Sequence, residues 1–182
     1  MKYVQLIIIL SAIALAGCQP WTHIKKAKNE TVYKNINVAL PVGWVQFNPP
    51  KHLVLTKDGS GVQNIMVRKF KHEEAFENIE KSSSSALAVS ELADLYITNF
   101  KKGNEDITVN VKSMKPYKFQ NDVEGFEVEL ELLTKKGLTR VLKVNGAAMD
   151  YGLVLFSFDS PKLHYFNRDV TAYDELVKSA TL

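Results

Sequence analysis

Apolar and polar residues alternate in several stretches of the chain, and this alternation is typical of β-strands that have one buried face. The stretch 35–40 places Ile36, Val38 and Leu40 on a single face of such a strand. Runs of the same kind are predicted as strands at residues 44–47, 52–56, 62–70, 107–111 and 117–120. Proline and glycine clusters separate the first strands, and Lys57–Gly61 has the composition of a tight turn.

The hairpin over residues 126–144 is the strongest of these predictions. Four apolar residues alternate with three glutamates in its first strand, and Gly137 ends the loop that follows. If Gly137 takes the left-handed position of a three-residue loop, Thr134 pairs with Leu138. The resulting register has three facing pairs: Val128 with Val144, Leu130 with Leu142, and Glu129 with Lys143. Apolar pairs then share one face and an opposite-charge pair lies on the other, which supports this register.

Two amphipathic helices are predicted. The first spans Ser90–Lys102, with Ser90 as its N-cap and Gly103 directly after its end. The second spans residues 169–182 and begins either at Thr171, which has capping-box spacing, or at Asp169. Both carry apolar residues at helical spacing, which predicts that each packs one face against a core.

The order of these elements predicts the fold class. Residues 151–158 form an apolar run that we expect to be covered on both faces and therefore to be a central strand. Residues 71–85 are polar and predict a loop with a short helical turn. Seven or eight strands linked mainly by hairpins, with one helix in the middle and one at the end, predict an α+β fold: an antiparallel β-sheet flanked by helices.

The N-terminal residues have the layout of a cleaved secretory signal. Lys2 is followed by a short apolar run, which is shorter than the roughly 20 residues that a membrane-spanning helix needs. The run ends in Leu15, Ala16, Gly17 and Cys18, which resemble the lipobox of bacterial lipoproteins. That resemblance implies cleavage before Cys18 and acyl chains on its sulfur and amine. The alternative interpretation is an ordinary signal peptide, or a short N-terminal anchor that happens to contain a cysteine.

Cysteine content favours the lipoprotein interpretation. Cys18 is the only cysteine, and a free thiol in an oxidising compartment is a liability that lipidation removes. The chain is thereby divided into a signal peptide (1–17), a lipidated tether (18–30) and one globular domain (31–182). Gln19 after the cysteine, rather than aspartate, resembles an outer-membrane address. We therefore expect a lipid-anchored, periplasm-facing protein of the bacterial envelope, on the outer rather than the inner membrane.

Charge excludes one class of partner. The formal net charge of the 182 residues is +3, without a basic stripe, and this predicts no nucleic-acid binding. Lys25, Lys26 and Lys28 cluster after the predicted anchor. They are interpreted either as a solvated tether or as cations that attract anionic headgroups.

Several stretches together resemble the Mog1/PsbP-like family, over roughly residues 31–182. They are Leu40-Pro41-Val42-Gly43-Trp44, the midchain helix with Glu91-Leu92-Ala93, Tyr96 and Asn99-Phe100, the long hairpin with its following apolar strand, and the closing helix. The resemblance implies a sheet domain flanked by helices, an α/β/α sandwich. It implies no catalytic residue set, because members of this family serve unrelated roles, and fold alone does not assign function.

Polar residues with catalytic or metal-binding potential are scattered along the chain. The histidines are His23, His52, His72 and His164. His72-Glu73-Glu74 with Glu77 lacks the spacing of a helical metal motif and predicts a surface loop. Gly59-Ser60-Gly61 precedes a strand rather than the helix that a phosphate loop requires. Ser82–Ser85 has no His or Lys at a spacing that would mark a nucleophile, so the sequence predicts no catalytic residue, metal site or cofactor.

Two further groups admit two interpretations each. Glu127, Glu129 and Glu131 have the spacing of glycosidase acid pairs, but alternating glutamates are typical of the solvated face of a strand. Five aromatic residues are expected in the core, with an apolar groove as the alternative: Trp44, Phe47, Tyr117, Phe119 and Tyr151. These observations predict a non-catalytic module that binds or supports an envelope protein. A small-ligand carrier or an envelope enzyme with a pocket between sheet and helices is the alternative, and a purely structural role is the third.

Overall fold

The computed structural model describes residues 21–47 and 52–182. Its strands are β1 (Trp21–His23), β2 (Lys28–Val32), β3 (Ile36–Leu40), β4 (Val45–Phe47), β5 (Leu53–Thr56), β6 (Asn64–Phe70), β7 (Thr108–Lys118), β8 (Glu124–Leu133), β9 (Thr139–Met149) and β10 (Gly152–Pro161). The helical elements are η1 (His72–Glu74), η2 (Glu77–Ile79), α2 (Val89–Lys102), η3 (Lys162–Phe166) and α3 (Asn167–Lys178).

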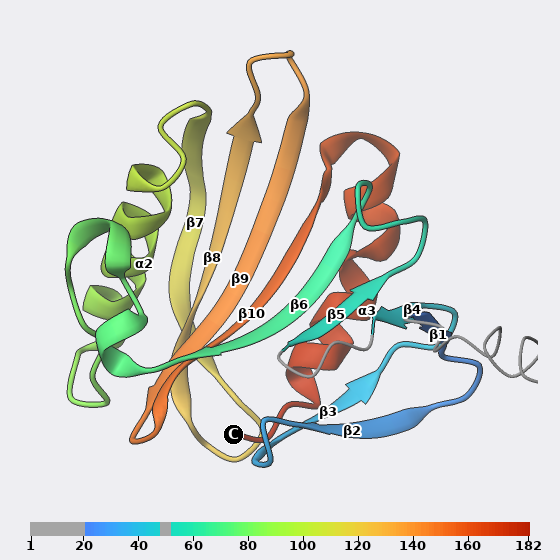
Figure 1. Cartoon of the computed structure of the whole chain (residues 1–182), viewed down its shortest axis with the longest axis horizontal. Coiled ribbons are helices and arrows are strands. Elements are labelled where there is room, and N and C mark those ends of the chain that lie inside the picture. The colour runs from blue at the N-terminus through green and yellow to red at the C-terminus, as the bar shows by residue number, and fades with distance from the viewer. Residues whose placement is uncertain (1–20, 48–51) are drawn as a thin grey trace, which may run out of the picture.

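Eight strands form one antiparallel sheet in the order β1-β4-β5-β6-β10-β9-β8-β7, and β2 and β3 form a separate hairpin. Helices α2 and α3 lie on opposite faces of the large sheet (Figure 1). The architecture is α+β, an antiparallel sheet flanked by helices, and this confirms the predicted fold class.

Strand β10 lies in the middle of the large sheet and is buried on both faces. Leu153 and Leu155 belong to the apolar cluster under α2, whereas Val154, Phe156 and Phe158 belong to the cluster under α3. Because side chains alternate across a strand, a single run of apolar residues serves both layers. The prediction of a central strand at 151–158 is confirmed.

The predicted hairpin register is also confirmed. Val128 faces Val144, Leu130 faces Leu142, and Glu129 faces Lys143. Gly137 has a φ of +78°, and the backbone N–H of Thr134 donates to the carbonyl of Leu138. The three-residue loop therefore sets the pairing as its glycine predicts.

Strand β7 is longer than predicted and forms one edge of the sheet. The two short strands expected at 107–111 and 117–120 overlap the two ends of one strand, which stops at Lys118 and has an irregularity between Val111 and Ser113. This irregularity shifts the alternation, so the sequence pattern is interrupted although the pairing with β8 continues. Pro116 is accommodated because one side of an edge strand needs no ladder hydrogen bond.

The expectation that residues 18–30 form only a tether outside the globular domain is wrong where the chain is described. Residues 21–23 form β1, which pairs Trp21 with Phe47 on β4, and residues 28–32 form β2. Ile24 is buried between these strands, and its backbone exchanges hydrogen bonds with Trp44 and Gly43. These strands are short and polar, so they carry no apolar period for sequence reasoning to detect.

Both helices begin earlier than predicted. Ala88, not Ser90, is the N-cap of α2, and it makes no side-chain capping hydrogen bond. Helix α3 has Phe166 as its N-cap rather than Asp169 or Thr171. Asp169 is instead buried inside the first turn of α3, where it contacts the turn between β5 and β6.

Candidate functional site

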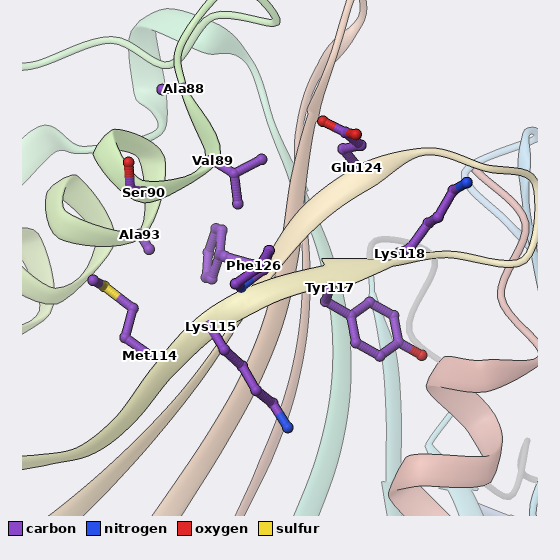
Figure 2. A pocket seen from close by; sticks show the side chains of 11 residues that line it. Ala88, Val89, Ser90, Ala93, Met114, Lys115, Tyr117, Lys118, Glu124 and Phe126 are labelled. Carbon is purple, nitrogen blue, oxygen red and sulfur yellow. The ribbon is translucent and has the colours of Figure 1, made fainter.

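A groove of about 730 Å³ lies between the first turns of α2 and the edge strand β7 (Figure 2). We call it the α2–β7 groove. Its lining residues are Ala88, Val89, Ser90, Ala93, Met114, Lys115, Pro116, Tyr117, Lys118, Glu124 and Phe126. The volume is in the range of ligand-binding clefts, and the groove opens beside an exposed sheet edge.

Helix and sheet periodicity together make the interior of the groove apolar. Val89 and Ala93 are four residues apart and therefore lie on the same face of α2. Pro116 pairs with Phe126, and Met114 pairs with Val128, so these side chains share the α2 face of the sheet. In Figure 2, Val89, Ala93, Met114 and Phe126 point into the space between helix and strands.

Phe126 forms the base of the groove and is fully buried. Its ring lies 5.7 Å from the ring of Tyr96, measured between centroids, and Tyr96 is itself buried in α2. Burial raises the pKa of the Tyr96 hydroxyl, so this group stays neutral beneath the groove. The base of the groove is therefore part of the core between α2 and the sheet.

The charged residues lie at the margins of the groove. Lys115 and Tyr117 point away from α2 and toward α3, while Lys118 and Glu124 lie near the end of the β7–β8 hairpin (Figure 2). Alternation along β7 explains this separation, because odd and even positions face opposite sides of the sheet after the irregularity. The groove thus combines an apolar interior with exposed lysines on its edge strand.

On the opposite face of β7 and β8, Glu127 lies in a small polar cleft and is buried. Its carboxylate lies 3.0 Å from Lys115 Nζ and 3.6 Å from Lys143 Nζ, and it accepts a hydrogen bond from Asn145. Burial acts to raise the pKa of Glu127, but the hydrogen bonds and charges of these partners outweigh it and lower the pKa. The prediction of a solvated glutamate face is therefore wrong at Glu127. Glu129 and Glu131 are more accessible than Glu127 but are half-buried, and Glu131 pairs with Lys162.

The remaining polar candidates are dispersed over the molecule. His72 Nδ1 lies 2.8 Å from Ser83 Oγ, His52 Nδ1 lies 3.2 Å from the Tyr33 hydroxyl, and His23 is exposed on β1. His164 is in the bend of η3 with a φ of +67°. Across the described ranges, no three His, Cys, Asp or Glu side chains lie together in a way that could hold a metal ion.

The five aromatic residues divide between the core and the surface. Trp44 and Phe119 are buried in the α3 core, whereas Phe47, Tyr117 and Tyr151 are half-buried. Tyr117 lines the α2–β7 groove, and Phe47 packs against Trp21 with ring centroids 4.6 Å apart. The interpretation as core residues holds for Trp44 and Phe119, Tyr117 and Tyr151 pack against the same core while half-buried, and the five do not line a common groove.

The lipobox residues Leu15, Ala16, Gly17 and Cys18 lie outside the described residues. Within the described part of the chain, no helix has the length and apolar character that crossing a membrane requires. Sequence reasoning missed the groove residues Ala88, Val89 and Met114. The available signal was the combination of several lysines with Pro116 in one segment, because this composition is typical of a strand at the edge of a sheet.

Comparison with known proteins shows the fold. No protein-family model matches the chain, and no curated protein matches its sequence. The cyanobacterial PsbP protein (CyanoP) of Synechocystis sp. PCC 6803 superposes with a TM-score of 0.63 at 11% identity, covering 93% of this chain and 99% of that one. The Saccharomyces cerevisiae Ran-binding protein Mog1p gives 0.55 at 13% identity, covering 86% and 96%. This chain therefore has the Mog1/PsbP-like fold.

Proposed function

We propose that this protein is a bacterial envelope lipoprotein, anchored through lipid on Cys18, whose domain binds another envelope protein without catalysis. The observation that carries the binding role is the α2–β7 groove, because apolar side chains point into it and charged groups lie at its margins. An arrangement of this kind favours recognition of an apolar segment over acid–base chemistry, which needs ionisable groups that converge on one point.

The occupant that fits the groove is an apolar segment flanked by acidic residues on the partner protein. Three exposed lysines follow the edge strand: Lys112, Lys115 and Lys118. Lys118 pairs only with the exposed Asp122, so this pair competes weakly with a partner's carboxylates, whereas Lys115 pairs with the buried Glu127 on the opposite face of the sheet. Pro116 and the irregularity near Val111 oppose continuous strand addition, so side chains rather than backbone pairing are expected to hold the segment.

Two further observations support a lipid-anchored binding module. The fold neighbour Mog1p is a Ran-binding protein, so this fold is able to present a protein-binding surface. The lipobox ends in the only cysteine of the chain, and Gln19 follows it. Two or more acyl chains anchor a domain firmly, and the outer membrane is the expected location.

The anchor is tested by comparing the wild type with Cys18→Ala. We expect the wild type to incorporate labelled palmitate and to fractionate with membranes. We expect Cys18→Ala to do neither. Membrane fractionation of Cys18→Ala without any palmitate in the wild type would contradict the anchor.

The groove is tested by in-cell crosslinking and affinity purification of the tagged protein. Ala88→Trp fills the groove from an exposed N-cap that makes no side-chain hydrogen bond. Ala86→Trp is the matched control, because Ala86 is exposed on the same loop but does not line the groove. We expect one dominant partner with the wild type and Ala86→Trp, and at least tenfold less of it with Ala88→Trp. Equal recovery with both variants would contradict binding in the groove.

A small-ligand carrier is the second candidate, and the groove volume favours it because about 730 Å³ accommodates a small apolar molecule. Native mass spectrometry of the protein purified from its own envelope separates the two candidates. A bound small molecule that Ala88→Trp excludes and Ala86→Trp retains would support the carrier, or an enzyme acting on that molecule, in place of the protein-binding module.

A further inference from the structure

The N-terminal strand β1 begins very close to the predicted lipid attachment site. Trp21, its first residue, follows Cys18 by three positions, and three residues span at most about 11 Å even when fully extended. Pairing of Trp21 with Phe47 joins that strand to the large sheet. A lipid on Cys18 would therefore hold this edge of the folded domain against the bilayer, rather than leave the domain on a long tether.

We propose that the β1 edge of the domain docks on an anionic lipid bilayer. This inference rests on the proposed lipid anchor. We define the β1 surface by five residues that lie along this edge: Trp21, Lys25, Lys26, Val42 and Phe47.

The apolar part of the β1 surface suits the membrane interface. Trp21 and Phe47 form a half-buried aromatic pair, and Trp is enriched at the level of lipid headgroups. Val42 is 57% exposed beside Gly43, whose backbone N–H donates to the carbonyl of Ile24. A half-buried aromatic pair and an exposed valine therefore lie at the two ends of the short β1 edge.

The charge of the same region complements an anionic surface. Residues 21–47 contain four lysines and one glutamate, and Lys28 pairs with that glutamate, Glu30, at 2.5 Å. Lys25 and Lys26 are exposed and form no ion pair within the described residues. The whole chain has a formal charge of +3, to which Lys2 contributes one and this stretch three, so residues 48–182 carry −1. The positive excess of the mature protein therefore comes from residues 21–47, and Lys25 and Lys26 place part of it directly beside β1.

The fold also fixes the position of these lysines. The Ile24 side chain is buried, its N–H donates to the Trp44 carbonyl at 2.8 Å, and its own carbonyl accepts from Gly43 at 2.9 Å. Lys25 and Lys26 follow directly, beside a shallow hollow of about 360 Å³ that His23 and Gln46 also line. The lysines of a solvated tether would have no such fixed place, so the structure favours headgroup contact over the tether interpretation.

Docking in this way leaves the α2–β7 groove accessible. β1 and β7 are the two opposite edges of the eight-stranded sheet, and they lie at opposite ends of the molecule along its long axis (Figure 1). A bilayer beneath β1 would therefore not cover α2 or β7. The groove would lie at the edge of the sheet that is farthest from the membrane.

The two tryptophans of the chain provide the test. Trp21 lies on the β1 surface and Trp44 is buried, so bromine-labelled lipids should quench mainly Trp21. The lipidated, mature protein is reconstituted into vesicles of phosphatidylethanolamine with brominated phosphatidylglycerol, and vesicle flotation measures anchoring in the same sample. We expect quenching in the wild type and its loss in Trp21→Phe, which keeps Trp44.

Charge reversal separates docking from anchoring. For Lys25→Glu with Lys26→Glu we expect unchanged flotation and a fall of at least thirtyfold in the ratio of docked to undocked domain. Lys135→Glu with Lys136→Glu, at the tip of the β8–β9 hairpin, is the matched control and should behave as the wild type. Flotation without quenching would overturn the docking proposal while the anchor stands. A wild type that carries no lipid and does not float would overturn the anchor, and the docking proposal with it.

Discussion

β1 and β7 both end the eight-stranded sheet, yet they leave different surfaces at its two edges. β1 has three residues, its Trp21 packs on Phe47 of β4, and Lys25 and Lys26 follow it, whereas β7 has eleven residues and contains Pro116 and an irregularity. An exposed edge invites pairing with another chain, and these are two ways to prevent it: a very short strand, or a long one with interruptions and charge. The β7 edge can therefore border an open groove without becoming a site of uncontrolled strand addition.

The two edges also differ in what lies beneath them. Beside β7, Phe126 of β8 is fully buried against α2, so the groove is continuous with the core. At β1, Trp21 and Phe47 pack mainly on each other and remain half-exposed. The comparison predicts that damage under β7 destabilises the whole domain, while damage at β1 stays local.

The largest effect is expected for Phe126→Ala. Removal of this buried ring should lower the free energy of unfolding by about 3–5 kcal/mol, because it leaves a cavity between Tyr96 and the sheet. Urea unfolding of the Cys18→Ala protein, followed by circular dichroism, measures the change. Leu163→Ala is the control, since Leu163 is 76% exposed and should change stability by less than about 0.5 kcal/mol. A loss below about 1.5 kcal/mol for Phe126→Ala would show that the groove base is not part of the core.

Two buried carboxylates, Asp169 near the β1 edge and Glu127 near the β7 edge, allow a second comparison of their contributions to stability. Against the β1 half, Asp169 of α3 accepts a hydrogen bond from Gln63 and pairs with Lys57 at 3.1 Å and with Arg168. On the β7 half, Glu127 pairs with Lys115 and Lys143. The Asp169 side chain is 1% exposed and that of Glu127 is 10% exposed. We therefore expect Asp169→Asn to cost about 1–3 kcal/mol at pH 7 and Glu127→Gln about half of that.

The pH dependence of the free energy of unfolding should also reveal the contribution of Asp169. Burial acts to raise the pKa of Asp169, but hydrogen bonds from Arg168 and Lys57 outweigh it and hold the pKa below its usual value. A carboxyl group with a lowered pKa in the folded state stabilises the fold above the pKa of the unfolded chain, about 4, and loses this contribution as the pH falls further. Unfolding measured from pH 7 to pH 2 should therefore lose less stability in Asp169→Asn than in the wild type. Parallel curves for both proteins would contradict this account.

The parts of the fold that sequence reasoning predicted are those in which one local pattern decides the structure. The β8–β9 register follows from alternation with a period of two and from Gly137, and the burial of β10 follows from a run apolar on both faces. β1 and β2 escaped prediction because they are short and polar, and β1 is held by pairing with β4, which lies more than 20 residues further along the chain. The register of Trp21 with Phe47 leaves no trace in either segment alone.

The candidate site depends on tertiary contacts to an even greater extent. Val89 and Met114 are separated by 25 positions, and they line one groove only because β7 forms the edge beside α2. Asp169 has the sequence signature of a helix cap, but the turn between β5 and β6 places cations against it. Local propensity therefore located the helices, while the ends of those helices and the groove required the full topology.

The smallest effect is expected at β1. Phe47→Ala removes one ring of the half-exposed pair, so the free energy of unfolding should fall by only about 1 kcal/mol. The local consequence should be larger than the global one: amide hydrogens of Trp21–His23 should exchange much faster, while those of β10 keep their protection. Hydrogen exchange read by mass spectrometry checks both regions in one experiment, with Trp21→Ala as a second variant that should give the same pattern. If β1 and β10 lost protection together, the two edges would be equally integral to the core, and the contrast between them would fail.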